Sequence, residues 1–189
     1  MYRERMETLK EWKVSKNRKP LIIRGARQVG KTWLMKEFGK LYYEKCAYIN
    51  FDNNSRMDIL FNEEFDLDRI IQGLKIESGI NIEPENTLII FDEIQECPRA
   101  LTSLKYFREN APQYDIIVAG SLLGVACHEG TGFPVGKVSF MNLFPLSFEE
   151  FLLAMGEERF VELLNKKDFK TIKLFNNKYE KLLKQYCYV

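Results

Sequence analysis

The sequence has little of what metal-bound and disulfide-rich proteins depend on. It has 189 residues, of which one is histidine, and its four cysteines lie far apart without any CxxC pair. This scarcity argues against a structural zinc site and predicts reduced thiols in or near the core. The cysteines are Cys46, Cys97, Cys127 and Cys187.

Long apolar runs are also missing. No stretch approaches the roughly 20 apolar residues of a membrane span, and the first 19 residues contain no apolar core of a signal peptide. We therefore expect a cytoplasmic protein with no membrane partner. Because 46% of the residues are apolar and 13% are aromatic, the composition predicts a globular chain with one good core and a small appendage.

The net charge of +1 conceals a segregation of charge along the chain. Residues 1–19 carry a net charge of +4 and residues 166–189 carry +5, which leaves −8 between them. Basic ends can be solvated helix faces, or they can contact DNA or a protein partner. The sequence leaves both interpretations open.

Short apolar runs alternate with segments of helical periodicity up to about residue 145. Expected strands cover 21–24, 46–52, 87–93, 115–121 and 137–143, and expected helices cover 2–14, 66–79, 99–110 and a segment that starts at Lys31 and stops at Gly39. This alternation predicts an α/β domain, residues 1–145, with a parallel sheet covered by helices.

From residue 146 the pattern becomes entirely helical, which predicts a separate helical segment over 146–189. Five apolar residues there follow one another at steps of three and four, as on one face of a single helix. They are Ile172, Phe175, Tyr179, Leu182 and Tyr186.

The stretch "LIIRGARQVGKT", residues 21–32, matches the pattern G-x-x-x-x-G-K-[ST] between an expected strand and an expected helix. Glycines allow main-chain N–H groups to surround an anion, and the helix N-terminus adds partial positive charge. Lys31 would reach the terminal phosphates, and the Thr32 hydroxyl would bind Mg²⁺. The predicted phosphate-binding residues are Gly25, Ala26, Arg27, Gln28, Val29, Gly30, Lys31, Thr32 and Trp33.

An acidic pair ends the apolar run of residues 87–93. Asp92 is expected to hold Mg²⁺ with Thr32, and Glu93 can accept a proton from an attacking water. The spacing of 60 positions from Thr32 to Asp92 leaves room for an additional strand and helix, which is typical of ATPases that activate water with a glutamate.

Other residues near these motifs remain open. Ser121, at the end of the next strand, can contact the attacking water or the γ-phosphate, or it can be a turn residue. His128 is either a contact near the nucleotide or a packing residue. Arg99 and Arg108 are candidate arginine fingers. Trp12 either lines an adenine pocket or packs in the core.

Together these landmarks resemble prokaryotic AAA-type ATPases that carry an appended C-terminal domain of unknown function. The resemblance runs from about residue 1 to residue 189 and is carried by "LIIRGARQVGKT", "YINFD", "LIIFDEIQECPRALTSLKYFRE", "IIVAGSLLGVACHEGTGFPVGKV" and "LFPLSFEEFL". It implies an AAA-like sheet of order 5-1-4-3-2 and ATP hydrolysis. By motif position it assigns Gly25–Thr32 to phosphate binding, Asp92 to Mg²⁺, Glu93 to activation of water and Ser121 to the sensor role.

The sequence departs from this family in two places. Lys137 stands where members often carry arginine, and a lysine lacks the bidentate fork of arginine if that position contacts the γ-phosphate. Relatives also continue beyond the point that matches "YCYV" into a second domain. Residues 146–189 are therefore expected to begin a longer C-terminal region that would determine partner specificity.

The expected function is Mg²⁺-dependent binding and hydrolysis of ATP, with Glu93, Lys31 and Ser121 as catalytic residues. One alternative is a nucleotide-gated module that binds DNA or protein and has little turnover. A second is a nucleotide or small-molecule kinase built on the same loop, against which the acidic pair and the 60-residue spacing argue.

Overall fold

The computed structural model describes residues 2–62, 64–120, 134 and 136–188. Its strands are β1 (Leu21–Arg24), β2 (Lys45–Asn50), β3 (Thr87–Asp92), β4 (Asp115–Ala119) and β5 (Ser139–Asn142). Its helices are α1 (Arg5–Val14), α2 (Lys31–Tyr42), α3 (Ser55–Asn62), α4 (Leu67–Ser78), the 3₁₀ turn η1 (Ile94–Glu96), α5 (Pro98–Asn110), α7 (Phe148–Ala154), α8 (Glu158–Asn165), α9 (Phe169–Leu174) and α10 (Asn176–Tyr186).

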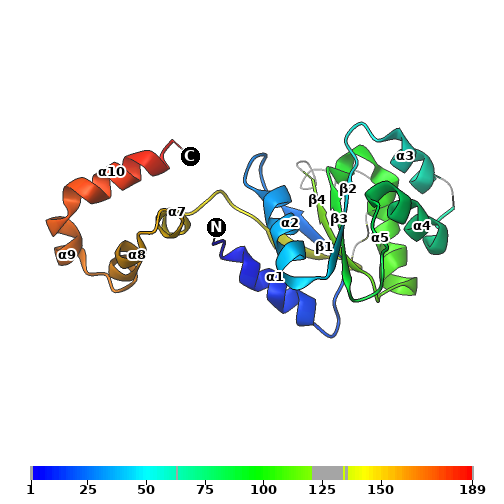
Figure 1. Ribbon diagram of the computed structural model, residues 1–189, viewed down its shortest axis with the longest axis horizontal. Coiled ribbons are helices and arrows are strands. Elements are labelled where there is room, and N and C mark those ends of the chain that lie inside the picture. Colours follow the sequence, from blue (N-terminus) through cyan, green and yellow to red (C-terminus); the bar gives the residue numbers. More distant parts are fainter. Residues whose placement is uncertain (1, 63, 121–133, 135, 189) are drawn as a thin grey trace.

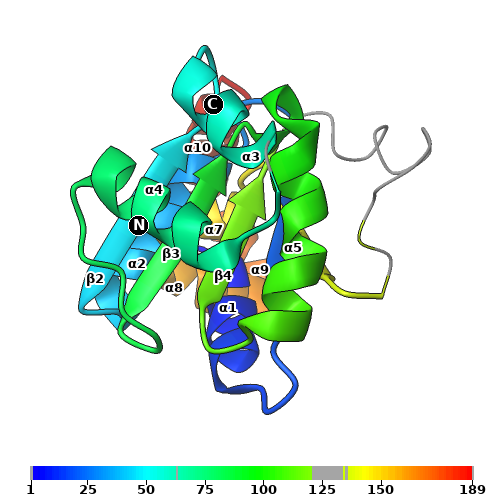
Figure 2. The same ribbon diagram turned by 90° about the vertical axis from the view of Figure 1, so that its right-hand side faces the viewer.

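The described strands form one parallel sheet in the order β2-β3-β4-β1-β5, which confirms the predicted α/β fold and strand order. In the registers of the sheet, β1 lies between β4 and β5, with Ile22 opposite both Val118 and Phe140. All strands of a parallel sheet end at the same edge, as Figure 2 shows for the arrowheads of β3 and β4. The segments that follow β1 and β3 therefore begin at this carboxyl edge.

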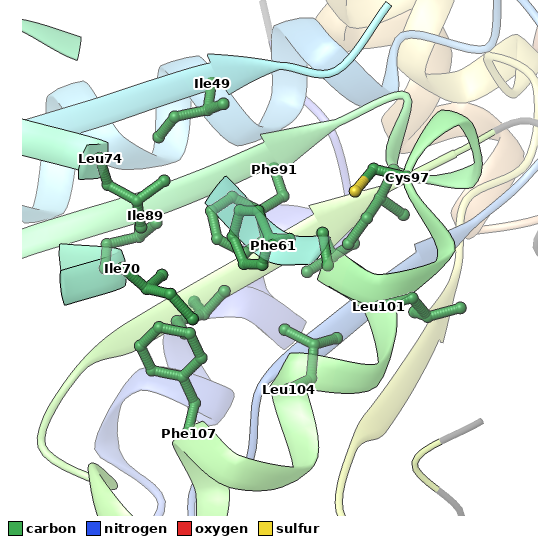
Figure 3. Packing of buried hydrophobic residues seen from close by; sticks show 14 of the residues in the cluster. Ile49, Phe61, Ile70, Leu74, Ile89, Phe91, Cys97, Leu101, Leu104 and Phe107 are labelled. Atoms are coloured by element: carbon green, nitrogen blue, oxygen red, sulfur yellow. The ribbon is translucent and has the colours of Figure 1, made fainter. Parts of the chain in front are cut away.

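Helices cover both faces of the sheet (Figure 1). Successive strand residues point to opposite faces, and those of β3 are buried on both. On one face, α3, α4 and α5 pack against Ile22, Ile89 and Phe91, and Figure 3 shows the side chains of this cluster. On the other face, α1 and α2 pack against Ile23 and Ile90.

The helical segment, residues 146–188, has a smaller core of its own. Its buried apolar residues are Phe151, Leu152, Phe160, Val161 and Leu182. In Figure 1 the helices α8 and α9 lie well away from the sheet, whereas α10 runs back toward it. Among the described residues, none of the helices has the length and apolar character that crossing a membrane requires.

Two expectations for the helices were wrong. Gly39 does not stop its helix, because α2 continues to Tyr42. A Cβ atom at this position would lie 2.8 Å from Sγ of Cys46, so the glycine allows α2 to approach β2 closely. The apolar stripe from Ile172 to Tyr186 is not one helix, because α9 ends at Leu174 and α10 begins at Asn176.

The cysteines agree only in part with the prediction that they lie in or near the core. Cys97 is buried and Cys46 is half-buried, but Cys187 is exposed at the end of α10. Cys127 lies outside the described residues.

Candidate functional site

The loop between β1 and α2 lies at the carboxyl edge of the sheet, as its sequence predicts. A Cβ atom at Gly25 would lie 2.3 Å from the carbonyl oxygen of Leu143, so only glycine fits where the loop leaves β1. Leu143 also donates its N–H to the carbonyl of Arg24, at 2.7 Å. The loop ends at Gly30, whose φ of 90° immediately precedes α2. We call residues 25–32 the phosphate loop.

Lys31 begins α2 with its side chain folded over the phosphate loop. The residue is buried, and its Nζ donates to the carbonyl oxygens of Gly25 and Ala26 at 3.0 and 2.7 Å. Burial lowers the pKa of this amine, and the nearby carboxylates of Glu93 and Asp92 partly oppose that effect. An anion entering the loop would raise this pKa and offer stronger acceptors than two carbonyls.

Asp92, the last residue of β3, receives hydrogen bonds from two neighbouring elements. The hydroxyl of Thr32 on α2 donates to its Oδ2 at 2.6 Å, and the hydroxyl of Tyr48 on β2 donates to the same atom at 3.0 Å. Asp92 is 4% exposed. Burial and the adjacent Asp92 raise the pKa of Tyr48, so this phenol remains protonated and able to donate. Residues distant in sequence thus meet at one carboxylate.

Glu93 turns away from the strand immediately after Asp92. Its φ of 52° lies in the left-handed region, which residues other than glycine rarely adopt and which occurs often at functional sites. The Nε2 of Gln95 donates to Oε2 of Glu93 at 2.6 Å. Oε1 of Gln95 is buried and has no hydrogen-bond partner in the described part of the chain. This amide holds the Glu93 carboxylate in place.

A cavity of about 550 Å³ opens between the phosphate loop and residues 92–96, which we call the acidic turn. That volume falls within the range of small-molecule sites. The lining residues are Arg27, Gln28, Gly30, Lys31, Thr32, Trp33, Asp52, Glu93, Gln95 and Glu96. The structure therefore brings together Lys31, Thr32 and Glu93 at one cavity, with Asp92 in hydrogen-bond contact with Thr32.

A second cavity, of about 590 Å³, shares three residues of the phosphate loop with the first. It lies between that loop, the start of the chain and the helical segment. Its lining is Arg3, Arg27, Gln28, Val29, Gly30, Pro145, Leu146 and Tyr186. The hydroxyl of Tyr186 donates to the carbonyl of Leu146 at 2.7 Å, which fixes the end of α10 beside this cavity.

Three candidates from the sequence have other partners in the structure. Trp12 packs in the core against Phe38, with ring centroids 6.4 Å apart, and its Nε1 donates to the carbonyl of Lys19. Arg99 donates to the carbonyl of Phe61 at 2.8 Å. Arg108 donates to the carbonyl of Arg18 and to the side chain of Asn17.

Of the two interpretations of Trp12, packing in the core is therefore the correct one. Both candidate arginine fingers are held by acceptors of their own chain. Ser121 and His128 lie outside the described residues.

Lys137 lies at the wrong edge of the sheet for a phosphate contact. It precedes β5, so it lies near the amino edge, opposite the phosphate loop. There its Nζ forms an ion pair with Glu109 at the end of α5, at 2.8 Å. The possibility that this position contacts the γ-phosphate fails because parallel strands begin and end at opposite edges.

The side chains at Asp92 fit a magnesium ion. Magnesium prefers oxygen ligands and usually binds proteins through one or two side chains, with waters and phosphates completing its shell. The described residues contain no group of three or more histidine, cysteine or acidic side chains suited to a metal. Because Thr32 gives its hydrogen to Asp92, the oxygen lone pairs of its hydroxyl remain for a cation.

Two members of the site, Tyr48 and Gln95, were not predicted from the sequence. Both belong to segments that carried the resemblance, "YINFD" and "LIIFDEIQ". Tyr48 follows the period-two pattern of its strand, and only the adjacency of β2 and β3 shows that its hydroxyl meets Asp92. Gln95 was detectable as a polar residue within the acidic turn.

Comparisons with known proteins agree with this fold. A family model described as an AAA domain matches residues 17–152. A Walker-type ATPase of Pyrococcus abyssi superimposes with a TM-score of 0.50 at 16% identity, covering 96% of this chain and 75% of that one. The Drosophila ORC, solved bound to DNA, gives a TM-score of 0.55 at 18% identity, covering 92% of this chain and 52% of that one.

At these identities the two structures are similar in fold alone, and this chain spans about half of the Drosophila protein's length. No curated protein matches the sequence. The family model, by contrast, covers well over half of the chain and includes both the phosphate loop and the acidic turn. The chain therefore belongs to the AAA domain family, with the fold of a P-loop ATPase.

Proposed function

We propose that this chain binds Mg·ATP at the phosphate loop and hydrolyses it. The observation that carries the proposal is the 2.6 Å hydrogen bond from Thr32 to Asp92 beside the buried Lys31. These groups lie at the end of a strand and the start of a helix. The ammonium group can bind the phosphates of a triphosphate, and the hydroxyl and the carboxylate can bind its metal ion.

Each side chain has a distinct role in this proposal. Lys31 exchanges the carbonyls of Gly25 and Ala26 for phosphate oxygens. Thr32 and Asp92 hold the magnesium ion, which when bound neutralises charge on the phosphates. Glu93, oriented by Gln95, accepts a proton as water attacks the γ-phosphorus and the bond to the β-phosphate oxygen breaks. Ser121 keeps its proposed sensor role.

The base of the nucleotide is assigned to the second cavity. Apolar side chains line one side of it, and it adjoins the phosphate loop at Gly30, so one ligand can reach both cavities. Tyr186 offers an aromatic ring there, so it takes the adenine-lining role for which Trp12 was a candidate. The helical segment thus contributes directly to the proposed site.

We infer ATP rather than GTP as the substrate. The stretch Asn165-Lys166-Lys167-Asp168 matches the pattern that GTPases use to recognise guanine, but it lies between α8 and α9, away from the sheet (Figure 1). The Asp168 carboxylate there caps α9 by accepting from the N–H and hydroxyl of Thr171 at 3.1 and 2.7 Å. That aspartate therefore acts as the N-cap of α9, and we do not assign it to guanine recognition.

Titration calorimetry with ATP, ADP and GTP in the presence of Mg²⁺ tests the proposal. We expect ATP and ADP to bind and GTP to bind more weakly. Lys31→Ala removes charge-assisted hydrogen bonds to phosphate and should weaken ADP binding about a hundredfold. Lys40→Ala, at an exposed position further along the same helix, is the matched control and should bind normally. No binding to the unmodified chain, or equal binding by both variants, would defeat the proposal.

A DNA-binding module remains the second candidate. The Drosophila ORC was solved bound to DNA, and the lysines of residues 166–188 in this chain are exposed. At the other basic end, Arg3, Lys10 and Arg18 form ion pairs within the chain, which reduces the positive charge available to DNA there. A titration of duplex DNA at several salt concentrations tests the lysines of residues 166–188, because phosphate contacts require the logarithm of the affinity to fall linearly with the logarithm of the salt concentration.

A further inference from the structure

Arg3 lies where three parts of the chain meet. The residue is 5% exposed. One terminal nitrogen, Nη1, donates to the carbonyl of Val29 in the phosphate loop at 3.2 Å. The other, Nη2, donates to the carbonyl of Phe144, just beyond β5, at 2.8 Å. Its Nε lies 3.2 Å from Oε1 of Glu150 on α7.

Glu150 is itself held on both carboxylate oxygens. Its Oε2 accepts the N–H of Ser147 at 2.9 Å, which completes a capping box at the start of α7. Its Oε1 accepts the N–H of Glu4 at 2.8 Å. This glutamate is 6% exposed, so water has little access to it. The position of its carboxylate therefore depends on the position of the helical segment. The position of α7 therefore fixes the position of Arg3.

The contact with Val29 reaches the phosphate loop at a sensitive point. Val29 and Gly30 share one planar peptide, in which the C=O and N–H groups point in opposite directions. Arg3 holds the carbonyl toward itself, which directs the N–H of Gly30 to the other side of the loop. In a phosphate loop the direction of the main-chain N–H groups determines how well an anion is bound.

Arginine suits this task better than lysine. Its planar guanidinium group presents donors in several fixed directions and stays charged in the protein interior. Here two of those donors bind a loop carbonyl and a linker carbonyl, while the charge of the guanidinium group faces a carboxylate. A lysine could keep the charge but could not meet all three acceptors at once.

We propose that Arg3 is a positioning residue that couples the helical segment to the phosphate loop. Glu150 sets the position of Arg3, Arg3 sets the orientation of the Val29–Gly30 peptide, and that orientation sets the affinity for the phosphates of a nucleotide. This inference rests on the proposed function. Coupling is reciprocal, so a partner that moves α7 would change nucleotide affinity, and a bound nucleotide would hold α7 in place.

Glu150→Gln gives the sharpest test, because Glu150 lines neither cavity. Glutamine also serves in a capping box, so α7 should remain intact while the charge facing Arg3 is lost. We expect ADP affinity, measured by calorimetry, to fall about fivefold, at the lower end of typical coupling between sites. Arg3→Met should weaken ADP binding by about tenfold or more, and Arg3→Lys should restore little of the loss.

Arg18→Met is the matched control for lost stability. Arg18 also comes from the start of the chain and forms an ion pair with a buried aspartate, Asp115, but at the amino edge of the sheet. This variant should unfold at a lower temperature yet bind ADP as the unmodified chain does. If Arg3 were merely structural, Arg3→Met and Arg18→Met would affect ADP binding alike, and the proposal would be overturned.

Two further measurements separate coupling from a local effect of Arg3. The double variant Arg3→Met with Glu150→Gln should bind ADP no more weakly than Arg3→Met alone, because both changes interrupt one pathway. Hydrogen exchange over residues 147–154 should slow when ADP binds to the unmodified chain and should not slow in Glu150→Gln. Unchanged affinity in Glu150→Gln would refute the coupling even if Arg3→Met bound weakly. An unmodified chain that does not bind ADP would instead refute the proposed function, and this inference with it.

Discussion

The two edges of the sheet each carry a buried aspartate that accepts a hydrogen bond from a tyrosine. At the carboxyl edge Tyr48 donates to Asp92 at 3.0 Å, and at the amino edge Tyr43 donates to Asp115 at 2.7 Å. The surroundings of the two pairs differ. Asp115 also forms an ion pair with Arg18, whereas no described lysine or arginine forms an ion pair with Asp92, which instead accepts from Thr32 beside an open cavity.

This difference separates a structural carboxylate from a candidate ligand. The charge of Asp115 is satisfied within the chain, so that pair can only hold α1, α2 and β4 together. The carboxylate of Asp92 accepts two hydroxyls and the N–H of Glu93 but forms no ion pair with a described residue, which leaves its charge able to attract a cation from solvent. Identical residue types therefore acquire different chemistry from the elements around them.

The largest effect should come from the glutamate that follows Asp92. Glu93→Gln removes the proposed proton acceptor but retains the shape of the side chain, so ADP binding should persist. Steady-state ATPase activity should fall by a factor of about 10²–10⁴, the usual contribution of a general base. Glu109→Gln, which breaks the ion pair with Lys137 at the amino edge, should leave turnover unchanged. Full turnover in Glu93→Gln would remove this residue from the mechanism.

A smaller effect is expected when the aspartate of the carboxyl edge is changed. Asp92→Asn keeps hydrogen-bonding capacity but removes the negative charge that would hold Mg²⁺. ADP affinity without metal should be unchanged or higher, since a negative charge near the phosphates is gone. The gain in affinity on adding Mg²⁺ should shrink by about tenfold, as expected for losing one strong interaction with a charged group. Calorimetry with EDTA and with Mg²⁺ measures both values, and an intact Mg²⁺ gain would contradict the metal role.

The smallest effects should come from the two tyrosines. Tyr48→Phe and Tyr43→Phe each delete one hydrogen bond to a buried carboxylate, so each should lower the free energy of unfolding by about 1–2 kcal/mol. Denaturant titrations of the two variants would measure these losses. Only Tyr48→Phe should also change the Mg²⁺ concentration needed for half-maximal ADP binding, by about threefold, which corresponds to less than 1 kcal/mol. Equal metal dependence in the two variants would show that Tyr48 has no influence on the site.

Much of the site could be predicted because its signals are local in sequence. The phosphate loop depends on the spacing from Gly25 to Thr32, and the acidic turn directly follows the apolar run of β3. The strands were also predictable, because residues buried on both faces of a parallel sheet form continuous apolar runs.

Other features depend on contacts that sequence spacing cannot show. The helix α3 was not predicted, although Met57 and Phe61 are buried four residues apart on one face of it, because it has only 8 residues between two loops. The break between α9 and α10 interrupts a stripe of perfect helical periodicity. The contact of Arg3 with Glu150 joins residues that lie far apart in the sequence.

The pairing of β1 has a consequence for how the chain is made. β1 comes first in sequence, but both of its neighbours, β4 and β5, lie more than 90 residues downstream. Contacts of such high sequence separation form late because loop closure costs entropy. On the ribosome, we expect the segment that becomes β1 to have no partner until Asp115–Ala119 has emerged, and to lack its second partner until Ser139–Asn142 follows. A nascent chain should therefore acquire its nucleotide-binding edge only near the end of synthesis of the sheet.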